Sequence, residues 1–486
     1  MTRLLTARNT LFFVALLTLW RLDLATHLQL HPDEAYYWLW SRHLDLSYFD
    51  HPPMVAYFIR LTTVFSQAET WIRMTGVLVP VALSALTWRL ALHLFQSVPV
   101  AAGSVVVVNA YPFSTLAMLV MTPDVPLLFF STLCIYFYLE LIHRSKAGFW
   151  YLTGLAFGMA LLSKYTAVLL APCLFLHLLF SEGRRWLRTP HPYLALLLGL
   201  LCFLPVVLWN ERHDWISFVF QFRHGLTKEE PSLDHVLTYI GGQMLVAGPL
   251  LWLLGVYAAL HATLTRDRRA LLLASLSIPV IAFFAWTSYR TTAGPNWPMF
   301  VYVPFAVLLS HYGLSSAWPW RRGLWTVGVL SSLLLSAVLT LHARFGLLPL
   351  ARYAPHLAAA DATNHFYGWR ELGQALLQEQ GLTFVRTPSH QLSAEIIYYT
   401  RERIASHPDP SSRPSQFTLW GWPAGIAAEG SPGVWTDTDL ALPTPTASSA
   451  EASTITFHGQ RDGRIIRRYY LMRAHAPSAA SSPASH

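Results

Sequence analysis

Charged residues are scarce in this chain. Only 12% of its 486 residues are Asp, Glu, Lys or Arg, whereas 53% are hydrophobic. Soluble domains carry roughly 25% charged residues, so the composition excludes an ordinary soluble protein. The apolar residues gather in stretches that reach the length of about 20 residues needed to cross a bilayer as a helix.

Cysteine is almost absent. Its three occurrences, Cys134, Cys173 and Cys202, fall within apolar stretches. We therefore expect neither a disulfide framework nor a zinc site with C-x-x-C spacing. The chain also lacks a G-x-x-x-x-G-K-[ST] loop and an H-E-x-x-H motif, which excludes P-loop and zinc-peptidase chemistry. These patterns establish no cofactor and leave a divalent metal open.

The net charge of +8 does not indicate a nucleic-acid partner. No basic face with interleaved aromatic residues is available to follow a phosphate backbone. The basic residues instead lie in short segments between apolar stretches, as the positive-inside rule requires of cytoplasmic loops. This distribution predicts a multi-pass protein of the bacterial inner membrane with its N-terminus in the cytoplasm.

Hydropathy and turn residues predict a polytopic α-helical fold with eleven transmembrane helices. They are expected near residues 11–28, 71–95, 99–117, 125–142, 149–163, 164–181, 191–209, 239–262, 269–288, 296–313 and 321–342. We expect the first stretch to be retained, because no small-x-small cleavage site follows it. An odd number of spans places everything after residue 342 on the periplasmic side.

The composition predicts three regions. Residues 1–342 form the transmembrane domain, 343–475 a small periplasmic α/β domain, and 476–486 a disordered tail rich in Ala, Ser and Pro. In the second region we expect a helix over 367–378, and strands over 382–386, 394–400, 416–420, 453–457 and 465–471.

The long first periplasmic loop, residues 29–70, departs from a simple hairpin. Apolar residues at helical spacing over 54–65 are too few to span a membrane, so we expect an interfacial helix there. Pro52 and Pro53 suit its first turn, where no amide donor is required. A second polar and aromatic segment, residues 210–238, is expected to cover a cavity as a lid.

The carboxylates of Asp33 and Glu34 stand next to each other where the first span leaves the membrane. Neighbouring side chains diverge, so one carboxylate could remove a hydroxyl proton while the other serves the structure. The alternative is a helix start with a capping Asp. Asp50 and His51 bring a second carboxylate and an imidazole to the start of the interfacial helix, where an anion site or a solvated turn are both open.

Three further motifs fall near the outer membrane face. Asp124 opens the fourth span, and Lys164 is a positive charge in an apolar stretch; such groups pair or serve a substrate. Asp124 could pair with Lys164 or Arg290 and have no other role. Arg290 suits phosphate recognition, but it and Asn296 also lie where aromatic residues anchor the headgroup level.

Taken in order, these motifs resemble a known superfamily. They are Asp33-Glu34-Ala35-Tyr36-Tyr37-Trp38, Tyr48-Phe49-Asp50-His51-Pro52-Pro53-Met54, Thr122-Pro123-Asp124, Leu162-Ser163-Lys164-Tyr165 and Asn296-Trp297-Pro298. The set is similar to bacterial protein O-mannosyltransferase-like proteins, a superfamily that also includes aminoarabinose lipid A transferases and galacturonosyl transferases. The match covers about residues 10 to 400.

The resemblance implies a GT-C membrane fold and inverting transfer of one sugar from a polyprenyl-phosphate donor to an envelope lipid, glycan or protein. It implies Asp33 as the catalytic base with Glu34 beside it, matches Lys164 to a basic residue of the lipid A transferases, and places Asp50 and His51 where those enzymes have an acidic residue followed by lysine. With Arg290 added from its position, we expect Lys164, Arg290 and His51 to contact the donor phosphate. His51 departs from the lysine of the lipid A transferases. A carrier that flips lipid-linked sugars is the alternative, and a scaffold that uses the C-terminal domain to bind an envelope partner is a third.

Overall fold

The computed structural model describes residues 4–226, 231–315, 318–354, 358, 361–426, 431–436, 452–461 and 464–474. Among them, the residues up to His27 and those from Trp40 to Leu341 form one compact unit. We call this the membrane unit. The segment Leu28–Leu39 folds with the residues from His342 onward into a second, the C-terminal unit. The expected tail, 476–486, lies outside the described residues.

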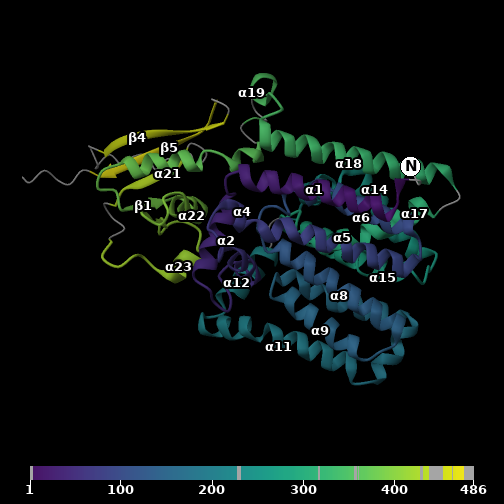
Figure 1. Ribbon diagram of the computed structural model, residues 1–486. Coiled ribbons are helices and arrows are strands. Elements are labelled where there is room, and N and C mark those ends of the chain that lie inside the picture. The colour runs from purple at the N-terminus through teal and green to yellow at the C-terminus, as the bar shows by residue number, and fades with distance from the viewer. Residues whose placement is uncertain are drawn as a thin grey trace, which may run out of the picture. The chain divides into compact units, whose positions relative to one another are not determined.

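Helices make up the membrane unit (Figure 1). In chain order they are α1 (Ala7–His27), α3 (Met54–Thr63), α4 (Glu69–Ile72), α5 (Met74–Phe95), α6 (Val98–Ala110), α7 (Pro112–Leu116), α8 (Asp124–Arg144), α9 (Gly148–Leu161), η2 (Tyr165–Leu169), α10 (Leu170–Phe180), η3 (Glu182–Arg188), α11 (His191–Arg212), α12 (Ile216–Leu226), α13 (Leu233–Ala247), α14 (Pro249–Leu264), α15 (Leu271–Ser275), α16 (Ile278–Ser288), η4 (Met299–Val301), α17 (Tyr302–Leu314) and α18 (Pro319–Phe345). The short helix α2 (Pro32–Arg42) begins in the C-terminal unit and ends in the membrane unit.

The described residues contain six helices that are long and apolar enough to cross a membrane, or eight if two bent pairs each count as one span. The expected number of eleven is therefore not confirmed. The chain is nevertheless a multi-pass membrane protein by the length and composition of these helices.

The helix expected over 239–262 is two helices, α13 and α14, which meet at an angle of 103°. Gly248 separates them with a φ of +86°, a conformation that side chains other than glycine rarely adopt. Pro249 then begins α14 without needing an amide donor. Periodicity alone did not reveal this break, because both halves are apolar.

Small residues bring α9 and α11 into close contact. A Cβ atom on Gly154 would lie 2.2 Å from the carbonyl oxygen of Ala195, and one on Gly158 would lie 2.8 Å from that of Gly199. Such backbone approach is the usual role of small residues at helix interfaces in membranes. Figure 1 shows α8, α9 and α11 as neighbouring helices.

Helix α3 begins directly after Pro53, as expected for residues 54–65. One face, including Val55 and Ile59, is fully buried. Leu61 and Phe65, near its end, leave 65% and 73% of their surface exposed. An exposed apolar end on a helix too short to span is what a helix in the membrane interface presents to lipid.

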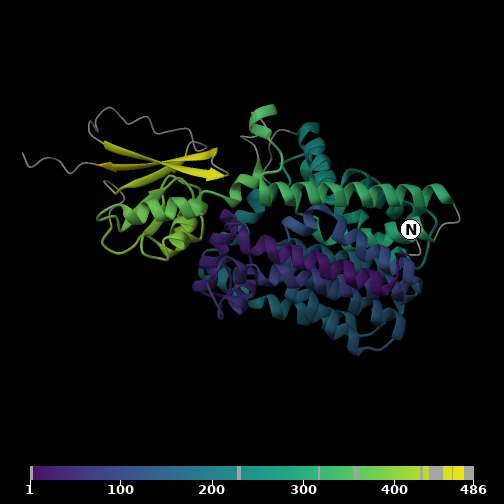
Figure 2. The ribbon, with the colours of Figure 1, turned by 45° about the horizontal axis from the view of Figure 1, so that its top comes forward.

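The C-terminal unit contains a five-stranded sheet in the order β2-β1-β3-β5-β4. Its strands are β1 (Phe384–Thr387), β2 (Ala405–Pro408), β3 (Gly433–Thr436), β4 (Ala452–Arg461) and β5 (Arg464–Ala474). β1 pairs in parallel with β2 and β3, whereas β5 pairs antiparallel with β3 and β4. The helices α21 (Trp369–Gln378) and α22 (His390–Tyr399) lie on one face (Figure 2).

Two of the expected strands are wrong. Residues 394–400 lie largely in α22, and 416–420 form the helix α23 (Gln416–Trp420). In α22, Leu392 and Ile396 are four residues apart on the buried face, and the hydroxyl of Ser389 caps the first turn. The helical spacing outweighs the β-branched residues that favour a strand. The helix expected over 367–378 and the strands expected over 382–386, 453–457 and 465–471 correspond to α21, β1, β4 and β5.

Candidate functional site

A buried ion pair joins two of the expected site residues in the membrane unit. The ammonium nitrogen of Lys164 lies 2.8 Å from Oδ1 of Asp124, and both side chains are less than 10% exposed. The amide nitrogen of Asn296 donates to the other carboxylate oxygen of Asp124 at 2.7 Å. Lys164 and Asn296 lie 40 and 172 positions after Asp124 in the sequence, and both bind its carboxylate.

The local backbone places each member of this cluster. Asp124 is the first residue of α8, where the helix N-terminus favours a negative charge. Lys164 stands in extended conformation between α9 and η2, so the helical ladder is interrupted at this residue. Among the described residues the Lys164 ammonium makes this one hydrogen bond, which leaves two N–H donors for a ligand.

The turn that carries Asp50 and His51 packs against the same stretch of chain as Lys164. The amide of Met54, at the start of α3, donates to the carbonyl of Leu162 at 3.1 Å. The Tyr165 side chain interacts electrostatically with Asp50. The side-chain amide of Gln221 on α12 closes the turn from the other side by donating to the Asp50 carbonyl at 2.6 Å.

The C-terminal unit holds Asp33 and Glu34 at the start of α2, and the two carboxylates have different surroundings. Glu34 is fully buried, and its carboxylate accepts the backbone N–H of His31 at 2.9 Å. This is the carboxylate half of a capping box, since Glu34 is the third residue of the helix. The Asp33 side chain is 42% exposed. Of the two, Asp33 is the carboxylate available to a substrate.

A pair of histidines lies beside Asp33. Nδ1 of His31 is 3.9 Å from the Asp33 carboxylate and accepts the Asp33 backbone N–H at 3.3 Å. Nε2 of His31 lies 3.3 Å from Nδ1 of His365. Because the Asp33 amide needs an acceptor at Nδ1, the neutral His31 carries its proton on Nε2 and donates it to His365. Burial lowers the pKa of His365 below its usual value, and the nearby His31 and Arg467 lower it further.

Arg290 does not join the Asp124 cluster. It is exposed at the end of α16, with its guanidinium 5.1 Å from the ring of Trp286. This cation–π contact at the edge of an apolar helix is typical of a residue at the headgroup level of the membrane. A role of Arg290 at the donor phosphate stays a prediction.

Sequence reasoning missed several residues of the site. The sequence motifs assigned no role to His31, and neither His365 nor Gln221 had any signal in the sequence. His365 reaches His31 through a contact 334 positions along the chain. No local pattern encodes such a contact. Among the described residues no group of three or more His, Cys, Asp or Glu is arranged to hold a metal ion.

Comparison with known proteins relates this geometry to a family. Residues 50–209 match the family described as dolichyl-phosphate-mannose-protein mannosyltransferase. The lipid A galacturonosyltransferase RgtD of Rhizobium johnstonii is 27% identical over 419 residues, which cover 81% of this chain and 83% of RgtD.

Solved structures of ArnT from Cupriavidus metallidurans resemble the whole chain. The structure bound to undecaprenyl phosphate has a TM-score of 0.64 at 17% identity and covers 96% of this chain and 98% of ArnT. The apo structure has a TM-score of 0.61 at 18% identity, with coverage of 95% and 97%. At this identity the likeness shows the fold, and the fold is that of a GT-C membrane protein.

The matched proteins named above are transferases, which decides between a transferase and a carrier: this chain is a membrane glycosyltransferase. Its sequence resembles that of the dolichyl-phosphate-mannose-protein mannosyltransferase family and of RgtD, and its fold resembles that of ArnT.

Proposed function

We propose that the protein transfers a single sugar from a polyprenyl-phosphate donor to lipid A or a related lipid of the envelope, on the periplasmic face of the inner membrane. A relative named for galacturonosyl transfer to lipid A supports the acceptor, and the ArnT structure bound to undecaprenyl phosphate supports the donor. The observation that carries the proposal is the buried Lys164 ammonium, which keeps two donors for a ligand in an apolar unit.

In this reaction Asp33 removes the proton from the acceptor hydroxyl while its oxygen attacks the anomeric carbon. The bond between that carbon and the phosphate oxygen breaks, its electron pair leaves with the polyprenyl phosphate, and the anomeric centre inverts. Lys164 then stabilises the charge that grows on the departing phosphate. A cation held in place at a water-poor site contributes most where such charge develops.

His31 and His365 have a supporting part. Nδ1 of His31 accepts the backbone N–H of Asp33 and so holds the start of α2 in place. His365 accepts the hydrogen on Nε2 of His31 and fixes the orientation of its ring beside Asp33.

The test compares the two neighbouring carboxylates. With a polyprenyl-phosphate sugar and lipid A as substrates, Asp33→Asn should lower kcat/KM by roughly 10²- to 10⁴-fold, the usual contribution of a general base. Glu34→Gln is the matched control. Its amide oxygen can still accept the His31 N–H, so this variant should keep most of its activity.

One control and two contrary outcomes make the result decisive. Both variants should elute as the wild type does in size-exclusion chromatography, which excludes misfolding as the cause. Full turnover by Asp33→Asn would remove Asp33 from the mechanism. Loss in Glu34→Gln with retention in Asp33→Asn would exchange the roles of the two carboxylates.

A further inference from the structure

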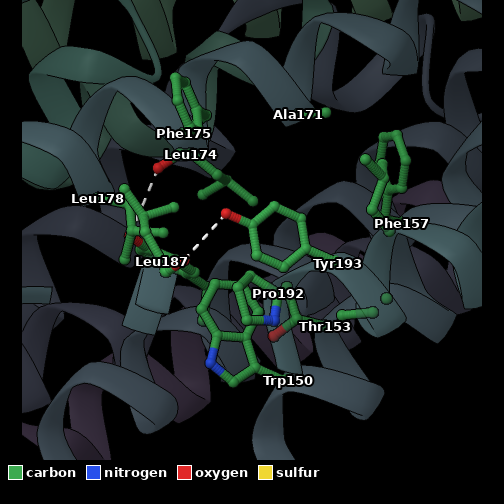
Figure 3. A pocket seen from close by; sticks show the side chains of 14 residues that line it. Trp150, Thr153, Phe157, Ala171, Leu174, Phe175, Leu178, Leu187, Pro192 and Tyr193 are labelled. Carbon is green, nitrogen blue, oxygen red and sulfur yellow. Dashed lines mark hydrogen bonds between the residues drawn. The ribbon is translucent and has the colours of Figure 1, made fainter. Parts of the chain in front are cut away.

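A cavity of about 150 Å³ opens among helices α8 to α11, and none of the residues proposed for catalysis lines it (Figure 3). Its walls are mainly aromatic and aliphatic, with Trp150 and Phe157 on α9, Leu174 and Phe175 on α10, and Tyr193 on α11. A cavity of that size takes a molecule on the order of benzene, so it can accept a segment of one hydrocarbon chain.

Most polar groups on the walls are already engaged by the protein. The hydroxyl of Thr153 donates to the carbonyl of Phe149 at 2.8 Å, and that of Tyr193 donates to the carbonyl of Leu187 at 2.9 Å. The exception is Trp150, which is 6% exposed and whose indole N–H has no partner among the described residues. A buried donor of this kind is satisfied in native proteins by water or by a ligand, so this N–H is available to an acceptor that enters the cavity.

A short basic helix, η3, borders the cavity. Leu187 lines the cavity, and the same short helix, η3, carries Arg184 and Arg188, both exposed and without an ion-pair partner among the described residues. The acidic residue of η3, Glu182, is neutralised by Arg268 at 2.7 Å. The apolar cavity therefore adjoins a short helix with two arginines that form no ion pair with any described residue.

We propose that this cavity binds an anionic phospholipid from the surrounding membrane. One acyl chain lies against the apolar wall, an ester carbonyl accepts the indole N–H of Trp150, and the phosphate lies near Arg184 and Arg188. An acyl chain, a hydrogen-bond acceptor and a negative charge occur in this order along a phospholipid. The proposal is independent of the proposed transfer reaction, because none of these residues takes part in it.

The test is a titration of the full chain, stripped of lipid in detergent, with dioleoyl phosphatidylglycerol or dioleoyl phosphatidylcholine, followed by native mass spectrometry. Wild type should bind the anionic lipid more tightly. Arginines near a membrane surface each strengthen binding of anionic lipid roughly fivefold, so Arg184→Gln with Arg188→Gln should weaken phosphatidylglycerol binding by about 25-fold. Binding of phosphatidylcholine should change little.

A control and a second variant locate the lipid. Arg269→Gln with Arg322→Gln removes two exposed arginines elsewhere in the membrane unit and should leave the preference intact. Ala171→Phe fills the cavity and should weaken binding of both lipids. A diazirine placed on the acyl chain of phosphatidylglycerol should label peptides from α9 to α11 in wild type and less in Ala171→Phe.

The proposal is overturned if the two lipids bind equally to wild type, or if the Arg184 and Arg188 variant loses no more binding than the control pair. Labelling confined to peptides outside α8 to α11 would also overturn it. Activity in the transfer assay, preserved in every variant, shows that each one has folded.

Discussion

Asp124 binds two partners at once, Lys164 through one oxygen and Asn296 through the other. Both ends of the ion pair are buried, so each charge depends on the other for the solvation that it has lost. The sequence left Asp124 to pair with either Lys164 or Arg290, and in the structure it pairs with Lys164. The sequence singled out Asp124 and Lys164 because a charge in an apolar stretch stands out, and Asn296 through its Asn-Trp-Pro motif.

Removal of either Asp124 or Lys164 alone should destabilise the protein. Asp124→Asn and Lys164→Met should each lower the free energy of unfolding by about 3–5 kcal/mol, since each leaves an uncompensated buried group. The double variant should lose less than the sum, because it buries no lone charge. A double-mutant cycle of unfolding in mixed micelles measures this coupling.

The matched control for that cycle is the ion pair of Arg268 with Glu182, in which both side chains are 87% exposed. Their coupling should be about 0–1 kcal/mol, because solvent screens the pair. Additive effects at Asp124 and Lys164, or a coupling as small as that of the exposed pair, would contradict a tightly bonded buried cluster.

At the scale of elements, the break between α13 and α14 shows what hydropathy does not report. The segment has the apolar content of one continuous span, yet Gly248 and Pro249 divide it. Gly248 approaches α18 so closely that a Cβ atom would lie 1.9 Å from the hydroxyl oxygen of Ser332. The helix positions were predictable from composition, whereas this angle depends on a contact with a distant helix.

Gly248→Ala should therefore destabilise the protein by about 1–3 kcal/mol, through its positive φ and through the clash with Ser332. Combining it with Ser332→Gly removes the clash and leaves the φ strain, so the double variant should recover part of the loss. Thermal unfolding in detergent measures both. Gly241→Ala is the control, since nothing lies within 4 Å of an added Cβ at that helical position. A Gly248→Ala protein as stable as Gly241→Ala would contradict the close approach.

At the scale of the whole molecule, the C-terminal unit should be the acid-sensitive part. His390 is buried against the ring of Tyr36, and burial, with a contribution from Arg413, lowers its pKa to about 3. The unfolded chain takes up a proton below about pH 6.5 while the folded unit does not. Stability is therefore complete above that pH and falls as the pH decreases toward the folded pKa.

Between pH 7.5 and pH 5 this histidine alone should cost the C-terminal unit about 2 kcal/mol. Hydrogen exchange of α22 in the full chain, corrected for intrinsic rates, measures the loss. His390→Phe should flatten the pH dependence, whereas the exposed His458→Gln should not. An unchanged slope in His390→Phe would assign the sensitivity to other groups, His365 first among them.

The sequence predicted much of this molecule and missed what depends on distant contacts. Helix positions and the catalytic candidates followed from composition and motif order. The sequence did not predict that Leu28–Leu39 folds with the C-terminal unit. This association depends on Gln29, which accepts the N–H groups of Trp369 and Arg370 on α21, more than three hundred positions along the chain. Local periodicity contains no information about such partners.

That segment has a consequence for biosynthesis. The hydroxyl of Tyr36 accepts the amide of Gln416, and the ring of Trp38 meets that of Tyr398. A ribosome that adds 5–20 residues per second needs about 20 to 75 seconds to make the 380 residues between Tyr36 and Gln416. For that interval the aromatic middle of α2 exists without its partners, so the C-terminal unit cannot complete its core until the last part of the chain is made.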